Sequence, residues 1–361
     1  MSRFTNFIGR NKLYVVLVVF IVGMNFLAFV GGKMMDEDSS EPQVTEEAAL
    51  KASEETDAET MFDEEDIEAR REKFEKIAED DPTLYLFLGL LNLLILFVIF
   101  LGVILDVYFL TCKARKRLFD ITLIRSEPAR WTLGDVARVT LIFLGCGYLF
   151  IILQSMVGEL IPVFNNDNFQ MVFNTAVMNV VGISVIFYFI VRKYGQKIEV
   201  VGLSAKKFLK GVFYGLTGYL AIIPVLILIM VVTYFVTKMF AYKPPVQPIV
   251  EIFMEEKQTA VLWFSTLFAA IFSPIAEEIF FRGFMYKAMK RKWGVFWSML
   301  ATALVFSLLH THIVGFLPIF VLGLLLAYLY ERTGSLVPSI CVHIVHNVGM
   351  VILVFLVRAL G

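Results

Sequence analysis

Apolar segments that are long enough to cross a bilayer recur along almost the whole chain. A run of about 18 or more apolar residues with few charges predicts a transmembrane helix. The composition agrees, because 58% of the 361 residues are hydrophobic and only 18% are charged, whereas soluble domains have about 45–50% apolar and roughly 25% charged residues. We therefore predict an all-α, polytopic transmembrane helical bundle. A disordered chain is excluded, and 3 cysteines are too few for a disulfide scaffold.

The apolar runs predict about eight or nine spans. The first is too long for a cleaved signal peptide, so we interpret it as an N-terminal anchor. The count has a range because two short segments meet around His310. The nine segments are residues 13–30, 85–111, 139–161, 171–191, 211–237, 261–284, 295–310, 314–330 and 336–356.

Charge is distributed very unevenly along the chain. Residues 33–82 hold 20 acidic and 6 basic side chains, a net charge of −14, so the remaining 13 acidic and 26 basic side chains give +13. Basic clusters at 113–117, 192–210 and 287–292 fall at alternate connections, which predicts that these loops are cytoplasmic. The N-terminus is then inside, and the acidic segment and the C-terminus are outside. Nucleic-acid binding is excluded, because the net charge is −1 and no basic domain stands apart.

The first half of the chain divides into three parts. Residues 1–32 form the predicted anchor. Residues 33–82 form an acidic extracytoplasmic insertion, which we expect to be largely disordered and then helical. Residues 83–200 contain additional transmembrane helices. Gly134-Asp135 faintly resembles an aspartyl intramembrane protease motif, but it lies in a polar connection and is interpreted as a helix cap.

Ionisable groups inside apolar helices are costly and usually functional. The segment around Glu277 and Glu278 contains two adjacent carboxylates followed by Arg282. Glu278 and Arg282 are four residues apart and share a helix face, which predicts an ion pair. Glu277 points about 140° away from Arg282 and is left free to act on water. An inter-helix ion-pair network is the competing explanation of the same residues.

Two further polar groups follow on neighbouring spans. Phe306 precedes His310 by four residues, and His343 precedes Asn347 by four. The second pair shares one helix side and can bind one polar atom, such as a developing oxyanion. Each group alone is equally typical of a buried hydrogen-bond pair between helices. Together, a glutamate and imidazoles in this order predict a hydrolytic site.

The sequence gives less support to other functions of the same residues. The His-Glu-x-x-His pattern of zinc proteases and the Gly-x-Ser-x-Gly elbow of serine hydrolases are both absent. A proton-coupled transporter would use the same carboxylates and histidines, but it should often show repeated halves, and none is visible. A non-catalytic membrane scaffold or immunity factor that keeps the fold is the other alternative.

These motifs resemble the type II CAAX prenyl endopeptidase and bacteriocin-processing intramembrane proteases, also known as abortive-infection or CPBP proteins. The family motifs are Glu-Glu-x-x-x-Arg, Phe-x-x-x-His and His-x-x-x-Asn/Asp, which are found here from Glu277, Phe306 and His343. The resemblance is strong over residues 261–348, and it assigns 201–361 to a CPBP-like protease core. It does not cover the first 200 or so residues.

The resemblance implies a membrane protease that hydrolyses peptide bonds. Glu277 and His310 would activate water, and His343 and Asn347 would stabilise the oxyanion, while Glu278, Arg282 and Phe306 would organise them. The family is named a metalloprotease family, and Glu277, His310 and His343 can supply three ligands for Zn²⁺ or another divalent metal. A buried carboxylate can equally act as a metal-free base, and we favour that mechanism.

The expected partners are a membrane-embedded or lipid-anchored protein or peptide substrate and the lipid bilayer. We expect a multi-pass protein of a prokaryotic cytoplasmic membrane.

The three motifs also pose a problem of depth. At ~1.5 Å per residue, Glu277 and His343 lie roughly 15 Å above their nearest cytoplasmic clusters, whereas His310 lies about 27 Å above Lys292. We therefore expect the helix near 292–297 to extend below the bilayer or to tilt.

Overall fold

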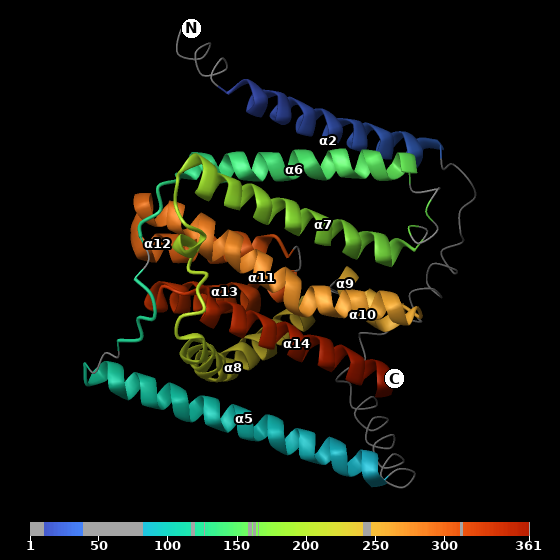
Figure 1. Cartoon of the computed structure of the whole chain (residues 1–361). Helices are drawn as coiled ribbons and strands as arrows, with labels where there is room; N and C mark the ends of the chain where they lie inside the picture. Colours follow the sequence, from blue (N-terminus) through green and yellow to red (C-terminus); the bar gives the residue numbers. More distant parts are fainter. Residues whose placement is uncertain are drawn as a thin grey trace.

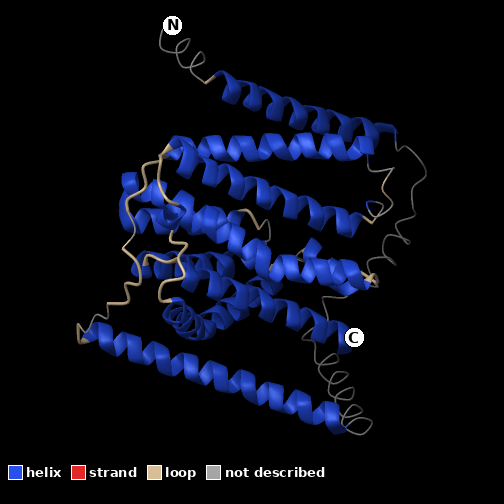
Figure 2. Ribbon diagram, viewed as in Figure 1, coloured by secondary structure: helices blue, strands red, loops and turns tan. Residues whose placement is uncertain are grey.

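The computed structural model describes residues 11–38, 82–116, 120–125, 127–157, 161, 164, 166–240, 247–310 and 313–360, with side chains omitted at 26–38 and 360. These residues form helices and turns and contain no strand (Figure 2), which confirms the all-α prediction. Residues 39–81, most of the acidic insertion, lie outside the described residues. Helix α2 (Lys12–Asp38) continues past the boundary predicted at residue 32.

Seven helices in the described ranges are long and apolar enough to span a membrane. The chain is therefore a multi-pass integral membrane protein. Six of them correspond to single predicted spans: α5 (Pro82–Ala114), α6 (Leu133–Val157), α7 (Asp167–Tyr188) with the π-helix η4 (Phe189–Lys193), α8 (Phe208–Met239), α13 (Ile313–Thr333) and α14 (Leu336–Leu360). The seventh is the long helical stretch Thr259–Leu308.

The count is lower than the predicted eight or nine for two reasons. Only Lys12–Asn25 of the first predicted span carries described side chains, so it ranks as a shorter apolar helix. The spans predicted at 261–284 and 295–310 are joined in Thr259–Leu308. This stretch consists of α10 (Thr259–Leu267), η6 (Phe268–Phe272), α11 (Ser273–Glu278), η7 (Ile279–Tyr286) and α12 (Lys287–Leu308).

Gly294 bends this long stretch and resolves the problem of depth. Its φ of 72° and ψ of −175° suit a glycine, which has no Cβ to clash at positive φ. The helix turns back at this residue, and as a result Phe306, which follows Gly294, contacts Phe281, which precedes it. Their ring centroids lie 5.1 Å apart. Glu277 precedes Gly294 by 17 residues and His310 follows it by 16. The two arms are nearly equal in length, so both side chains return to a similar depth.

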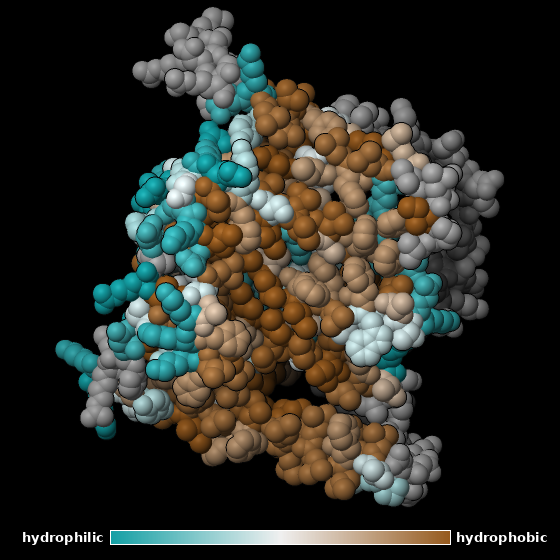
Figure 3. All heavy atoms as spheres, in the orientation of Figure 1, coloured by the Kyte–Doolittle hydropathy of each residue, from teal (hydrophilic) through white to brown (hydrophobic). Residues whose placement is uncertain are grey.

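The helices are arranged in a bundle with α2, α6 and α7 on one side and α5 on the other (Figure 1). In an apolar 18-residue segment of Thr259–Leu308, 33% of the residues are buried, against 6% in the corresponding segment of α5. Helix α5 lies along α8, where Gly102 comes so close that an added Cβ would lie 2.5 Å from the Leu220 carbonyl oxygen. Figure 3 shows a broad hydrophobic band beside a hydrophilic edge. Central helices therefore carry the core, and α5 is largely exposed.

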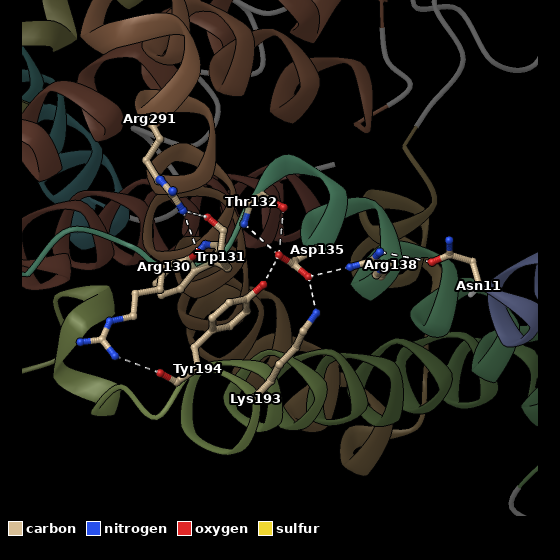
Figure 4. Close-up of polar contacts among 9 residues, drawn as sticks. All are labelled: Asn11, Arg130, Trp131, Thr132, Asp135, Arg138, Lys193, Tyr194 and Arg291. Atoms are coloured by element: carbon tan, nitrogen blue, oxygen red, sulfur yellow. Dashed lines mark hydrogen bonds and ion pairs between the residues drawn. The ribbon is translucent and has the colours of Figure 1, made fainter. Parts of the chain in front are cut away.

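A buried carboxylate, Asp135, organises the hydrophilic edge (Figure 4). Its Oδ2 accepts hydrogen bonds from the backbone N and Oγ1 of Thr132, at 2.9 and 3.0 Å, and from the Tyr194 hydroxyl. Its Oδ1 accepts from Arg138 at 3.1 Å and from Lys193 at 2.5 Å. The bond to the Thr132 N–H caps the start of α6, as predicted for this residue. We call these five residues the edge cluster.

A second set of contacts joins the loop before α6 to the long stretch. Arg291 donates from Nη1 to the carbonyl oxygens of Arg130 and Trp131 at 2.7 and 2.8 Å. The Trp131 ring stacks on Phe284 with centroids 5.2 Å apart and donates its Nε1–H to the Phe284 carbonyl at 2.9 Å. These bonds fix the long stretch near its bend.

Candidate active site

The predicted site residues on three helical segments converge on the ring of Phe306. This ring is 1% exposed. Its centroid lies 4.5 Å from the Arg282 guanidinium, 4.7 Å from the His310 ring and 5.5 Å from the His343 ring. Phe306 therefore brings η7, the end of α12 and α14 together around one apolar side chain.

Glu278 and Arg282 form a fully buried ion pair. Glu278 Oε1 accepts from Arg282 Nη1 at 2.5 Å, and both residues are 0% exposed. Arg282 Nη2 also donates to the Gly323 carbonyl oxygen of α13 at 3.2 Å. The pair predicted from the four-residue spacing is thus confirmed. Breaking such a pair leaves an uncompensated buried charge, which is strongly destabilising.

The ring of His343 lies between the two glutamates. Its Nδ1 is 3.0 Å from Glu278 Oε1, and its Nε2 is 3.7 Å from Glu277 Oε2. A carboxylate paired with arginine only accepts hydrogen bonds, so Nδ1 carries a hydrogen. In a neutral ring Nε2 is then an acceptor that faces Glu277. A separation of 3.7 Å is too long for a direct hydrogen bond, and it suits two groups that share a water molecule.

The two oxygens of Glu277 have different surroundings. Oε1 accepts a hydrogen bond from the Ser273 hydroxyl at 2.6 Å. Oε2 is buried and has no hydrogen-bond partner among the described residues. Ser273 in turn accepts from Asn179 Nδ2 of α7 at 3.4 Å. Sequence reasoning identified neither Ser273 nor Asn179. The four-residue spacing could have revealed Ser273, whereas no local pattern points to Asn179.

Asn347 binds the backbone of the long stretch through one N–H of its side-chain amide. In η6 the Ser273 N–H bonds the Phe268 carbonyl, five residues back. The next bond in this π-helical register would join residue 274 to the Ala269 carbonyl, but Pro274 has no N–H. Asn347 Nδ2 supplies the missing donor to Ala269 at 2.9 Å. Nδ2 carries a second hydrogen, so the oxyanion role of Asn347 stays a prediction.

His310 and His346 make different local bonds. His310 Nδ1 lies 2.8 Å from the Phe306 carbonyl oxygen, which makes Nδ1 the donor and leaves Nε2 as the acceptor in the neutral ring. His346 Nδ1 lies 3.1 Å from the Tyr219 hydroxyl of α8. His310 thus reaches the site through Phe306, and its predicted part in water activation stays a prediction.

The described residues do not form the three-ligand metal site considered from the sequence. Within them, no group of three or more His, Cys, Asp or Glu side chains is placed to hold a metal ion. Glu277 and His343 face each other, but His310 does not complete a ligand set with them.

Comparisons with known proteins find similarity in the same segment of the chain. Residues 259–349 match the family model described as type II CAAX prenyl endopeptidase Rce1-like. The protein named "Putative membrane peptidase YdiL" from Bacillus subtilis (strain 168) is 31% identical over 85 residues, which cover 24% of this chain and 35% of that relative. The matched part is thus about a third of the relative's length. No solved structure matches the chain. The resemblance seen in the motifs is confirmed over this segment.

Proposed function

We propose that this chain, whose residues 259–349 carry the Rce1-like segment, is an intramembrane endopeptidase. Its substrates are membrane-embedded or lipid-anchored proteins or peptides. The observation that carries the proposal is the position of His343, which is bound through Nδ1 to buried Glu278 and presents Nε2 toward Glu277 at 3.7 Å. This arrangement provides two adjacent acceptors for the hydrogens of one water molecule.

Glu277 is the general base in this proposal. A water molecule donates one hydrogen to Glu277 Oε2 and the other to His343 Nε2. The water oxygen attacks the peptide carbonyl carbon while Glu277 takes the first proton. When the tetrahedral intermediate collapses, Glu277 gives this proton to the leaving nitrogen, so the carbon–nitrogen bond breaks and the carboxylate is restored. A base of this kind contributes about 10²–10⁴-fold to the rate.

The other residues hold the two acceptors in place. Glu278 fixes the tautomer and orientation of His343, and Arg282 holds Glu278 in place by direct pairing at 2.5 Å. His343 thereby shares the binding of water, a part that the resemblance assigned to His310, and it does not take the oxyanion role that the resemblance assigned to His343. The remaining N–H of Asn347 is the donor that the proposal assigns to the developing oxyanion.

Membrane proteomics tests this proposal. Membranes that contain the wild-type chain or Glu277→Gln are compared for new protein N-termini, with Glu251→Gln as the control because Glu251 is exposed on α9 (Pro248–Glu255). We expect a set of N-termini to disappear in Glu277→Gln alone, while the uncut precursors accumulate. An unchanged set of N-termini, with Glu277→Gln folded and present in equal amount, would contradict peptide hydrolysis.

A further inference from the structure

A chain of hydrogen bonds runs from α7 to the proposed catalytic carboxylate. Asn179 Nδ2 donates to Ser273 Oγ at 3.4 Å, and the Ser273 hydroxyl donates to Glu277 Oε1 at 2.6 Å. The direction of donation is consistent along the chain, because an amide N–H can only donate and an ionised carboxylate can only accept. Bonds in such chains polarise and strengthen one another.

Ser273 departs from the usual behaviour of hydroxyl residues within helices. Thr175 and Ser184 of α7 donate to the carbonyl oxygens four residues back, at 2.9 and 2.7 Å. The corresponding acceptor for Ser273 is the Ala269 carbonyl, which accepts from Asn347 instead. The hydroxyl of Ser273 is thus directed forward to Glu277. A role confined to satisfying its own helix does not describe this residue.

Packing holds α7 in position against the long stretch. Asn166 caps the start of α7 by accepting from the Phe169 N–H at 2.8 Å. Val172 of α7 is buried in one cluster with Phe268 of η6 and with Ile252. The rings of Phe169 and Phe264 lie 5.6 Å apart. Helix α7 lies outside the matched residues 259–349, yet these contacts place Asn179 beside Ser273.

We infer that Ser273 and Asn179 are positioning residues, through which α7 orients Glu277 for catalysis. The inference rests on the proposed function. With Oε1 held by Ser273, the carboxylate presents Oε2 to His343 and to the water molecule. A misplacement of about 1 Å in a catalytic group can reduce a rate by about a hundredfold. The helices that precede residue 259 are then part of the catalytic unit rather than only an attached membrane module.

The test uses the full chain and peptides that span the cleavage sites lost in Glu277→Gln. Ser273→Ala should lower kcat about tenfold with KM changed less than about twofold, because a hydrogen bond to a charged group is lost. Ser273→Thr, which keeps the hydroxyl, should restore most of the rate. Asn179→Leu should lower kcat only about threefold, since its bond to Ser273 is longer.

Two variants serve as matched controls. Ser265→Ala removes a buried hydroxyl from the same long stretch, and this hydroxyl has no hydrogen-bond partner within the described structure. Thr175→Val removes a hydroxyl of α7 that bonds only its own helix. Both should keep the wild-type kcat. In a Glu277→Gln background, Ser273→Ala should cause no further loss of the residual rate, because its effect acts through Glu277.

The outcomes separate this inference from the proposed function. If Glu277→Gln abolishes cleavage while Ser273→Ala and Asn179→Leu behave like the controls, the positioning inference is wrong and the protease assignment stands. If Ser273→Thr loses as much kcat as Ser273→Ala, or if all losses follow a lowered melting temperature, the role is structural and the inference is wrong. If Glu277→Gln loses no cleavage sites, both the proposed function and the positioning inference are wrong.

Discussion

Two buried carboxylate clusters in this protein differ in how completely their polar atoms are satisfied. In the edge cluster, both oxygens of Asp135 accept hydrogen bonds from two or more donors. Around Phe306, by contrast, Glu277 Oε2, Glu278 Oε2 and Arg282 Nε are buried without a hydrogen-bond partner in the described part of the chain. Both clusters contain carboxylates and cations, so the difference does not lie in composition.

This difference distinguishes a cluster that stabilises the fold from the cluster that we propose to be catalytic. Native proteins satisfy almost all buried polar groups, and each exception calls for an explanation. A buried polar atom without a partner costs about 1–3 kcal/mol. The edge cluster avoids this cost and joins α6 to the end of α7. Around Glu277 this cost is not avoided within the described residues, and the proposed function gives Glu277 Oε2 a water molecule as its partner.

The largest effect that we expect to distinguish the two clusters is on the rate of peptide cleavage. Glu277→Gln should reduce peptide cleavage by about 10²–10⁴-fold, because the general base is lost. The fold should survive, since the glutamine carbonyl still accepts from Ser273. Initial cleavage rates and thermal unfolding in detergent are the measurements. Full activity in folded Glu277→Gln would break the distinction between the two clusters.

A second prediction concerns the neighbouring carboxylate. Glu278→Gln should lower the free energy of unfolding by about 3–5 kcal/mol, because it leaves Arg282 buried without its counter-ion. Glu278→Gln combined with Arg282→Met removes both charges and should recover part of that stability. Yields of monodisperse protein and melting temperatures test this. Equal yields for Glu278→Gln and the wild type would show that water reaches Arg282.

A third prediction applies to the edge cluster. Asp135→Asn should destabilise the folded protein by about 2 kcal/mol, because charged hydrogen bonds from Lys193 and Arg138 weaken. The loss is moderate since these cations are 37% and 35% exposed and remain hydrated. The fraction that stays folded should cleave peptides at the wild-type rate. A lowered kcat at equal folded protein would instead connect the edge cluster to the chemistry.

The parts of this structure that depend on local spacing could be predicted from the sequence. Apolar runs define the spans, and the ion pair of Glu278 with Arg282 follows from four residues within one helix turn. The placement of Asn347 could not be predicted in this way. Its bond depends on Pro274, on a π-helical register and on an opposing helix. None of these three is apparent from the four-residue spacing of His343 and Asn347.

Contacts between distant segments could not be predicted from the sequence either. Asn179 lies 94 residues before Ser273, and no pattern in α7 distinguishes it from the other asparagines. The bend at Gly294 follows a basic cluster, which indicates a connection but not its geometry. Its position gave the two arms nearly equal lengths, and straight-helix reasoning from the last lysine placed His310 too far out.

The smallest expected effect concerns the pH dependence of the edge cluster. Burial, and then the hydrogen bond to Asp135, raise the pKa of Tyr194 from 10.0 to about 12. A raised pKa means that the folded state favours the protonated hydroxyl. Its contribution is therefore complete below pH 10, and it is lost as the pH rises from about 10 to about 12.

Tyr194→Phe isolates this contribution. At pH 8 the variant should be less stable by about 1 kcal/mol, because one hydrogen bond to Asp135 is removed. Melting temperatures measured from pH 8 to pH 11.5 should then converge, since only the wild type loses the contribution of Tyr194 in this range. Tyr188→Phe, at an exposed tyrosine of α7, is the control and should run parallel to the wild type. Parallel curves for Tyr194→Phe and the wild type would show that this hydroxyl does not bind Asp135, and the edge cluster would then be less completely satisfied than the comparison requires.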